Sequence, residues 1–149
     1  MRLQKAILIP LARVLLVTGL VTLSSFPAMA AAPSTLLTGA QESPPVNSDA
    51  TAISTIRVAP DRSVTGDVDT TGIESTMAHI HLGAVGVSGP IVVTLAQVSA
   101  TRWSVPAGTT LTEAQYQSYR AGELYVNVHS DAYQGGEIRV QLAPPADAI

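Results

Sequence analysis

Hydrophobic and polar residues alternate along several short segments of the chain between residues 37 and 142. In the clearest of these, Leu124, Val126 and Val128 share one parity, and polar or aromatic residues occupy the other. Alternation with a period of two is typical of a β-strand that buries one face. The segments predicted as strands are 37–41, 52–58, 63–69, 77–82, 91–95, 124–129 and 137–142. In segment 52–58, Ile53 and Ile56 break the alternation, so the pattern does not predict its buried face.

One helix is predicted between the strands at 91–95 and 124–129. Thr110 and Glu113 have the spacing of a capping box, residues 114–120 follow as helix, and Gly122 is suited to end it. Turn-forming glycine and proline residues separate the strands, as in segment 83–90. Six or seven short strands with one inserted helix predict an all-β fold. We expect an antiparallel β-sandwich of Greek-key, immunoglobulin-like or superoxide-dismutase-like type.

The first 30 residues have the three parts of a secretory signal peptide. Arg2 and Lys5 make the start positive, residues 14–23 are apolar, and small residues precede a cleavage position near Ala30. A retained membrane anchor is the alternative, but proline, arginine and glycine residues interrupt the apolar stretch. We therefore expect an exported protein, periplasmic or extracellular, whose mature chain has no membrane span.

The mature chain is long enough for one domain. We expect residues 31–36 to form a disordered lead-in, residues 37–142 the domain and residues 143–149 a flexible tail. Three of the 8 basic residues lie in the leader and all 11 acidic residues lie beyond it, so the mature net charge is −6. Such an acidic domain is a poor partner for nucleic acid. Because there are no cysteines, disulfides, thiolate metal sites and cysteine nucleophiles are excluded.

All three histidines of the chain lie in two of the predicted strands. His79 and His81 flank Ile80, so both side chains leave the same face, with α-carbons about 6.5–7 Å apart. His129 lies on the outward, polar face of its strand, and would join the pair if the two strands are neighbours in the right register. Met77, two residues before His79, points the same way and is an additional candidate ligand. Three imidazoles with an optional thioether suit copper best and zinc next.

The same histidines are also compatible with a purely structural role. Their rings could hydrogen-bond to Asn127, Asp131 or loop carbonyls and hold an edge of the sandwich. A hydrolase site is not predicted, although Ser130 and Asp131 follow His129, because adjacent residues of a strand point apart. The metal interpretation gains weight because the whole histidine complement falls on outward faces of two strands.

Other polar patterns predict no site. Asp67, Asp69 and Glu74 lack the spacing of a calcium loop, so a solvated edge is favoured over a calcium site. Glu137 and Arg139 share a strand face and could pair, which at an exposed position contributes about 0.2–1 kcal/mol and no chemistry.

Four segments of the chain resemble the CHRD domain, a module first described in chordin and widespread in exported bacterial proteins. They are residues 37–46 (LTGAQESPPV), 78–95 (AHIHLGAVGVSGPIVVTL), 122–130 (GELYVNVHS) and 136–142 (GEIRVQL). Their order and spacing match the family's and span nearly all of the mature chain. The histidines fall on motif positions, Met77 does not, and the family often has glycine where Val140 stands.

The resemblance implies a β-sandwich, an extracytoplasmic location and no established enzymatic role. The His-Ile-His strand is also similar to that of copper-zinc superoxide dismutases. Their dinuclear site uses more histidines than this chain has, so dismutase activity is not predicted.

Two functional hypotheses follow, and neither is enzymatic. The first is an exported single-domain binding protein that holds a transition metal, copper favoured, through His79, His81 and His129. The second is a metal-free protein-interaction or structural module of the cell envelope or extracellular matrix, with an unknown protein partner. A mononuclear copper redox enzyme would further need an open coordination position. If His129 lay more than about 8 Å from the other two rings, one ion could not bind all three and the first hypothesis would fail.

Overall fold

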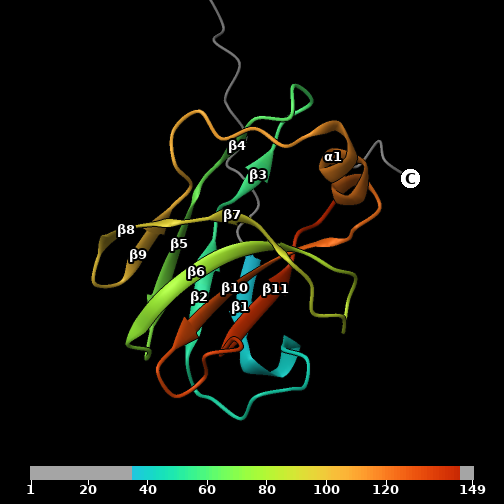
Figure 1. Cartoon of the computed structure of the whole chain (residues 1–149). Coiled ribbons are helices and arrows are strands. Elements are labelled where there is room, and N and C mark those ends of the chain that lie inside the picture. Colours follow the sequence, from blue (N-terminus) through green and yellow to red (C-terminus); the bar gives the residue numbers. More distant parts are fainter. Residues whose placement is uncertain (1–34, 145–149) are drawn as a thin grey trace, which may run out of the picture. The chain divides into compact units, whose positions relative to one another are not determined.

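The computed structural model describes residues 35–144 of the chain (Figure 1). The predicted signal peptide, residues 31–34 of the predicted lead-in and residues 145–149 lie outside the described residues. The elements are β1 (Thr35–Thr38), the 3-10 helix η1 (Gly39–Gln41), β2 (Thr51–Ser54), β3 (Arg57–Val58), β4 (Val64–Thr65), β5 (Asp67–Thr71), β6 (Ser75–Leu82), β7 (Ile91–Thr94), β8 (Ala96–Ser99), β9 (Arg102–Ser104), α1 (Glu113–Arg120), β10 (Leu124–Ser130) and β11 (Ile138–Gln141).

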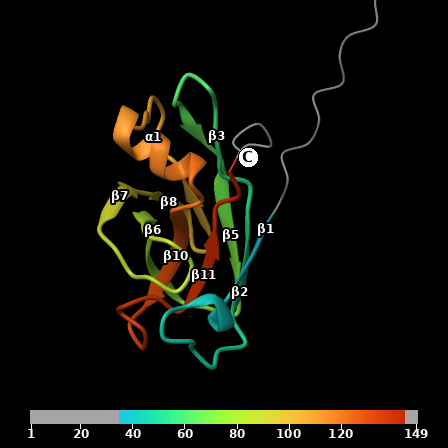
Figure 2. The same cartoon turned by 90° about the vertical axis from the view of Figure 1, so that its right-hand side faces the viewer.

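Within residues 35–144, nine strands form one antiparallel sheet in the order β7-β6-β10-β11-β1-β2-β5-β9-β8, and β3 pairs with β4 separately. The two end strands of the sheet, β7 and β8, follow each other along the chain with only Leu95 between them. Figure 1 shows them as one run of chain that joins the two ends of the sheet. The sheet therefore curls into a nearly closed, flattened barrel, with β6 and β10 opposite β2 and β5 (Figure 2). This confirms the predicted all-β class with one short helix.

The apolar core lies inside this curled sheet. Strands from both sides contribute side chains that are at most 1% exposed, including Leu37, Val68, Ile80, Val126 and Ile138. These residues alternate with outward-facing ones because successive side chains of a strand point to opposite faces. Burial of their apolar area, worth about 25 cal/mol per Å², is the main stabilising contribution to the fold.

The strand boundaries differ from the prediction in five places. The predicted strand 63–69 is two strands, β4 and β5, which lie in different sheets, and residues 39–41 of the predicted strand 37–41 form η1. The predicted strand 52–58 is two strands, because the chain leaves the sheet after Ser54; this explains the broken alternation, with Ile53 42% exposed and Ile56 buried. The hairpin of β8 and β9 was not predicted, since every residue of β8 is exposed and no alternation marks it. Finally, β1 begins at Thr35, inside the segment expected to be a disordered lead-in, and pairs along its length with β2.

The predicted helix 114–120 agrees with α1 to within one residue, but its capping box lies two residues later than predicted. The capping box is formed by Thr112 and Gln115: the Thr112 hydroxyl accepts from the Gln115 N–H at 3.2 Å, and the Gln115 amide oxygen accepts from the Thr112 N–H at 2.8 Å. Thr110 cannot cap the helix because it is held in an extended bridge with Ser63. Within residues 35–144, no helix is both long and apolar enough to cross a membrane.

Candidate metal centre

The three histidines lie on the outer face of β6 and β10, turned away from the apolar core. Ala78 and Ile80 of β6 are buried in the core, so His79 and His81 project from the opposite face. The cross-strand pairs on this outer face are Met77–His129, His79–Asn127, His81–Tyr125, Asn127–Arg139 and Tyr125–Gln141. We call these eight residues the outer polar layer. The register predicted as a condition for a single histidine cluster is thus present.

The centre of the outer polar layer is buried although it faces away from the apolar core, which the prediction of an outward, polar face did not include. His79, His81 and His129 are 5%, 8% and 5% exposed, and Asn127 and Arg139 are each 1% exposed. The reason is that loops fold back over the strands, so that both faces of β10 are covered. The alternation of apolar and polar residues correctly separates the two faces of β6 and β10. It cannot reveal that loops cover the polar face.

Segment 83–90 is one of these covering loops, and side chains of the layer hold it by its backbone. The Arg139 guanidinium donates to the carbonyl oxygens of Ala84 and Val87 at 3.0 and 3.1 Å. Gln141 donates to the carbonyl of Gly83 at 2.7 Å. Close approach of the backbone requires glycine here, because a β-carbon at Gly89 would overlap the carbonyl oxygen of Leu82. The predicted Glu137–Arg139 pair is wrong, since Arg139 is buried and directs its hydrogen bonds at this loop.

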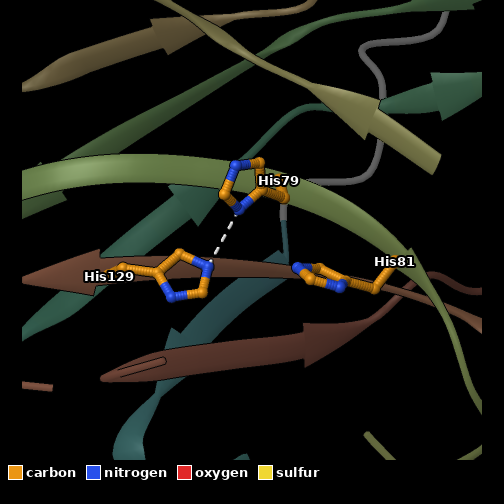
Figure 3. A group of neighbouring side chains, drawn as sticks. All are labelled: His79, His81 and His129. Atoms are coloured by element: carbon orange, nitrogen blue, oxygen red, sulfur yellow. Dashed lines mark hydrogen bonds between the residues drawn. The ribbon is translucent and has the colours of Figure 1, made fainter. Parts of the chain in front are cut away.

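The imidazole rings of the three histidines converge (Figure 3). One ring nitrogen from each lies within 4.8 Å of the others. The ring centroids of His79 and His129 are 4.9 Å apart, those of His79 and His81 are 5.4 Å apart, and those of His81 and His129 are 6.0 Å apart. Among the described residues, this is the one group of three potential ligand side chains whose atoms converge in this way. The three rings therefore meet the distance condition for a shared ion.

Backbone carbonyls fix the tautomers of two rings. His129 Nδ1 lies 3.0 Å from the carbonyl oxygen of Gln134, and His81 Nδ1 lies 2.9 Å from that of Gly89. A carbonyl only accepts, so both Nδ1 atoms carry the proton and both Nε2 atoms carry a lone pair when the rings are neutral. His79 Nδ1 lies 3.0 Å from His129 Nε2 and must donate to that lone pair. A ring whose Nδ1–H is held by a carbonyl, as in His81 and His129, is typical of histidines that bind metals through Nε2.

One histidine nitrogen is buried without any hydrogen-bond partner. It is Nε2 of His81, the atom that carries the lone pair and points toward the other two rings in Figure 3. Buried polar atoms are nearly always hydrogen-bonded, so an unpartnered one requires an explanation such as a water or an ion. Its position inside the histidine cluster makes it an unused acceptor directed at the centre of the candidate site.

Burial lowers the pKa of each of the three histidines. The pKa of His79 falls to about 4, because burial disfavours the imidazolium form and charge on His129 and His81 disfavours it further. Burial lowers the pKa of His81, which a backbone hydrogen bond opposes and the Arg139 charge reinforces. Burial likewise lowers the pKa of His129 against the effect of its own backbone hydrogen bond. All three rings are therefore neutral near pH 7, which is the protonation state that a metal ligand needs.

Met77 lies at the solvent side of the cluster. It pairs with His129 across β6 and β10, and its side chain is 42% exposed. Met77 thus follows the histidines at the solvent-exposed edge of the layer. This position agrees with the parity argument that placed Met77 on the same face as His79.

A buried carboxyl group, Glu42, also belongs to this region and was not singled out from the sequence. Burial raises its pKa to about 7, against the opposing effect of the Arg139 charge and a side-chain contact with Asn127. Its Oε1 atom and the Oδ1 atom of Asn127 are buried without partners. Gly136, at a φ of 127°, makes room for both residues, because a β-carbon there would lie 2.6 Å from Glu42 Oε1. No signal in the alternation marks Glu42, since it follows η1 in a loop.

Of the acidic residues predicted to form a solvated edge, Glu74 is exposed, and Asp67 and Asp69 are partly exposed. Asp69 forms an ion pair with Arg102, with Oδ1 2.6 Å from Nε, and both side chains are about half exposed. Asp67 accepts a hydrogen bond from the hydroxyl of Ser104. These contacts engage the carboxylates within the β5–β9 pair, which leaves the histidine cluster as the candidate site.

Comparison with known proteins identifies the family. The model of the CHRD domain matches residues 34–142, which is well over half of the chain and includes all three histidines. A search of curated proteins found no significant match, and a search of solved structures found none either. The matched range covers every strand that carries the outer polar layer. The chain therefore belongs to the CHRD domain family.

Proposed function

We propose that this protein binds a transition-metal ion through His79, His81 and His129. The observation that carries the proposal is the convergence of three neutral ring nitrogens within 4.8 Å, one of them buried without a partner. The backbone carbonyls that hold two of the rings already select the tautomer that binds through Nε2. Such preorganisation lowers the loss of conformational freedom on binding.

The cluster fits an ion after a small adjustment. Two nitrogens bound to one ion at about 2.0–2.1 Å are at most about 4.2 Å apart. The three nitrogens, all within 4.8 Å of one another, reach that limit through small ring rotations. His79 must lose the proton that its Nδ1 donates to His129 and carry one on Nε2 instead, because both nitrogens of that hydrogen bond are needed as ligands.

Copper is the preferred ion and zinc the second. Imidazole ligands suit both metals, and the general order of affinity among divalent ions peaks at copper. A thioether selects further for the softer Cu(I), and the pairing of Met77 with His129 across β6 and β10 supports Met77 as an additional ligand. The site contains no cysteine or carboxylate ligand that would favour a different metal.

We place this binding role outside the cytoplasm. The amino-terminal 30 residues have the charge and hydropathy pattern of a signal peptide, and CHRD domains are typical of secreted proteins. In that location the protein would store, buffer or pass on the ion. No catalytic activity is part of this proposal.

The deciding experiment titrates the chain, purified without a histidine tag, with Cu(I), Cu(II) and Zn(II). We expect one equivalent to bind, and expect His81→Gln and His129→Gln each to abolish tight binding. Gln97→Ala, at an exposed position of β8, is the matched control and should bind as the wild type does. Met77→Leu separates the thioether from the imidazoles: a loss of affinity for Cu(I) alone would make Met77 a ligand.

A failure to bind any of the three ions would overturn the proposal. The buried rings would then act as a hydrogen-bonded support for the loops, through the His79–His129 and carbonyl contacts. In that case the metal-free interaction module becomes the better hypothesis, and the search turns to protein partners.

A further inference from the structure

A buried positive charge lies behind His81. Arg139 is 1% exposed, and its guanidinium carbon lies 3.4 Å from the ring centroid of Tyr125. The Tyr125 ring is parallel to that of His81, with centroids 5.0 Å apart and an interplanar angle of 6°. Since β11 and β6 flank β10 on opposite sides, the phenol ring lies between the guanidinium and the imidazole. The three groups form one stack that ends at the candidate metal site.

This charge has no carboxylate partner at hydrogen-bond distance. The hydrogen bonds of Arg139 go to the carbonyls of Ala84 and Val87 and to the amide oxygen of Gln141, all uncharged. In residues 35–144, the ion pairs within 4.0 Å involve other arginines. Glu42 acts on Arg139 electrostatically from a greater distance. The guanidinium therefore retains most of its field in a poorly solvated layer.

The ligands do not offset that field. All three are neutral imidazoles, so a bound ion keeps its full formal charge. The Glu137 carboxylate accepts hydrogen bonds from the hydroxyls of Ser48 and Ser130, and these contacts are common to the wild type and every Arg139 variant. Repulsion by Arg139 scales with the charge of the ion and is twice as large for a divalent as for a monovalent ion. For two charges about 10 Å apart at an effective dielectric constant of about 20, each unit of charge on the ion weakens its binding roughly fifteen-fold.

We propose that Arg139 is a specificity-determining residue that makes the histidine site favour Cu(I) over the divalent ions Cu(II) and Zn(II). The inference rests on the proposed function, because it concerns the charge of the ion that the same three histidines hold. Arg139 touches neither the ion nor its ligands; it acts through space and through the Tyr125 ring that separates it from His81.

The test compares the affinities for Cu(I) and Zn(II) on one preparation of each protein. Cu(I) affinity is measured under reducing conditions by competition with a Cu(I) chelator, and Zn(II) affinity by competition with a zinc indicator. Arg139→Met removes the charge and keeps much of the chain length, whereas Arg139→Lys keeps the charge. We expect Arg139→Met to raise the Zn(II) affinity relative to Cu(I) about tenfold, and Arg139→Lys to leave that ratio within about threefold of the wild type.

A second variant acts in the opposite direction and does not depend on Arg139→Met being folded. Glu42→Gln removes the carboxylate that opposes Arg139 and nearly preserves the shape of the side chain. At pH 8, where Glu42 is largely ionised in the wild type, we expect it to lower the Zn(II) affinity relative to Cu(I) a few-fold. If the ratio of Zn(II) to Cu(I) affinity is unchanged in Glu42→Gln and, provided that it folds, in Arg139→Met, this inference is overturned while the proposed function stands. The absence of ion binding by the wild type would overturn it together with the proposed function.

Discussion

Nδ1 of His79 donates a hydrogen bond to Nε2 of His129 over 3.0 Å. The lone pair of His129 therefore has two competing partners, the His79 proton in the metal-free protein and an ion in the loaded one. Because the Gln134 carbonyl holds the His129 proton on Nδ1, His129 cannot serve both through different nitrogens. Loading the site with metal thus requires a change of tautomer at His79 and at no other histidine.

The tautomers of the three histidines are the first prediction. Without metal, all three rings should carry the proton on Nδ1; with one equivalent of Cu(I) or Zn(II), His79 alone should switch to Nε2–H. Long-range ¹H–¹⁵N spectra of the imidazole nitrogens distinguish the two forms. His81 and His129 serve as internal controls, because their Nδ1 protons stay on backbone carbonyls. A metal-free His79 already protonated on Nε2 would contradict the geometry.

The second prediction concerns stability in acid. His79 has a folded-state pKa of about 4 against an ordinary value of 6.5, so below pH 6.5 the unfolded chain binds a proton that the folded one resists. The free energy of unfolding of the metal-free protein should therefore fall as the pH drops from 6.5 to 4, by about 2–3 kcal/mol from this residue. Urea denaturation of the wild type and of His79→Gln at several pH values between 6.5 and 4 measures this fall in the free energy of unfolding. Parallel pH profiles of the two proteins would refute it.

The third prediction is that the contribution of Glu42 to stability changes with pH in the opposite direction to that of His79. Its folded-state pKa of about 7 is raised above the ordinary 4.5, so its contribution to stability is complete below pH 4.5 and is lost as the pH rises through 7. We expect Glu42→Gln to stabilise the protein by about 1–3 kcal/mol at pH 8 and to change little at pH 4.5. The difference between the denaturation curves of the two proteins at each pH isolates this effect from that of the histidines. A constant difference across the range would show that Glu42 ionises as in the unfolded chain.

The close approach of segment 83–90 to β6 supplies the fourth prediction. A β-carbon at Gly89 would overlap the Leu82 carbonyl, so Gly89→Ala must displace the loop that anchors His81 Nδ1. We expect a loss of about 1–3 kcal/mol in stability and a weaker affinity for metal. Gly135→Ala is the matched control, because a β-carbon there meets nothing within 4 Å. Equal melting temperatures for the two variants would contradict the packing described.

The sequence predicts most of the fold because the period of two is strong where a strand buries one face. The alternation of Leu124, Val126 and Val128 correctly assigns the core face of β10. It fails at β8, where all four residues are exposed and nothing distinguishes the two faces. The N-cap of α1 was assigned to Thr110 instead of Thr112 because Thr110 has the right residue type for a cap, and only its bridge to Ser63 excludes it.

The candidate site is predicted in part for the same physical reason. Parity places His79 and His81 together, and the pairing of β6 with β10 brings His129 to them. Parity places Arg139 and Tyr125 on the polar faces of their strands but does not reveal their roles, which depend on a loop folding back over the strands. Glu42 lies outside any periodic segment, and its burial follows from tertiary contacts that a local pattern does not encode.

The loops that cover the outer polar layer divide the described part of the protein into two regions of unequal stability. The apolar interior is enclosed by the curled sheet, whereas the histidines are separated from solvent by loops, among them segment 83–90 with its few side-chain anchors. Opening of these loops exposes the histidines while the strands remain paired, so it is a local event of lower free energy than global unfolding. The residence time of an ion in this protein would then be set by how often the covering loops open, and the lifetime of the fold by the barrel beneath them.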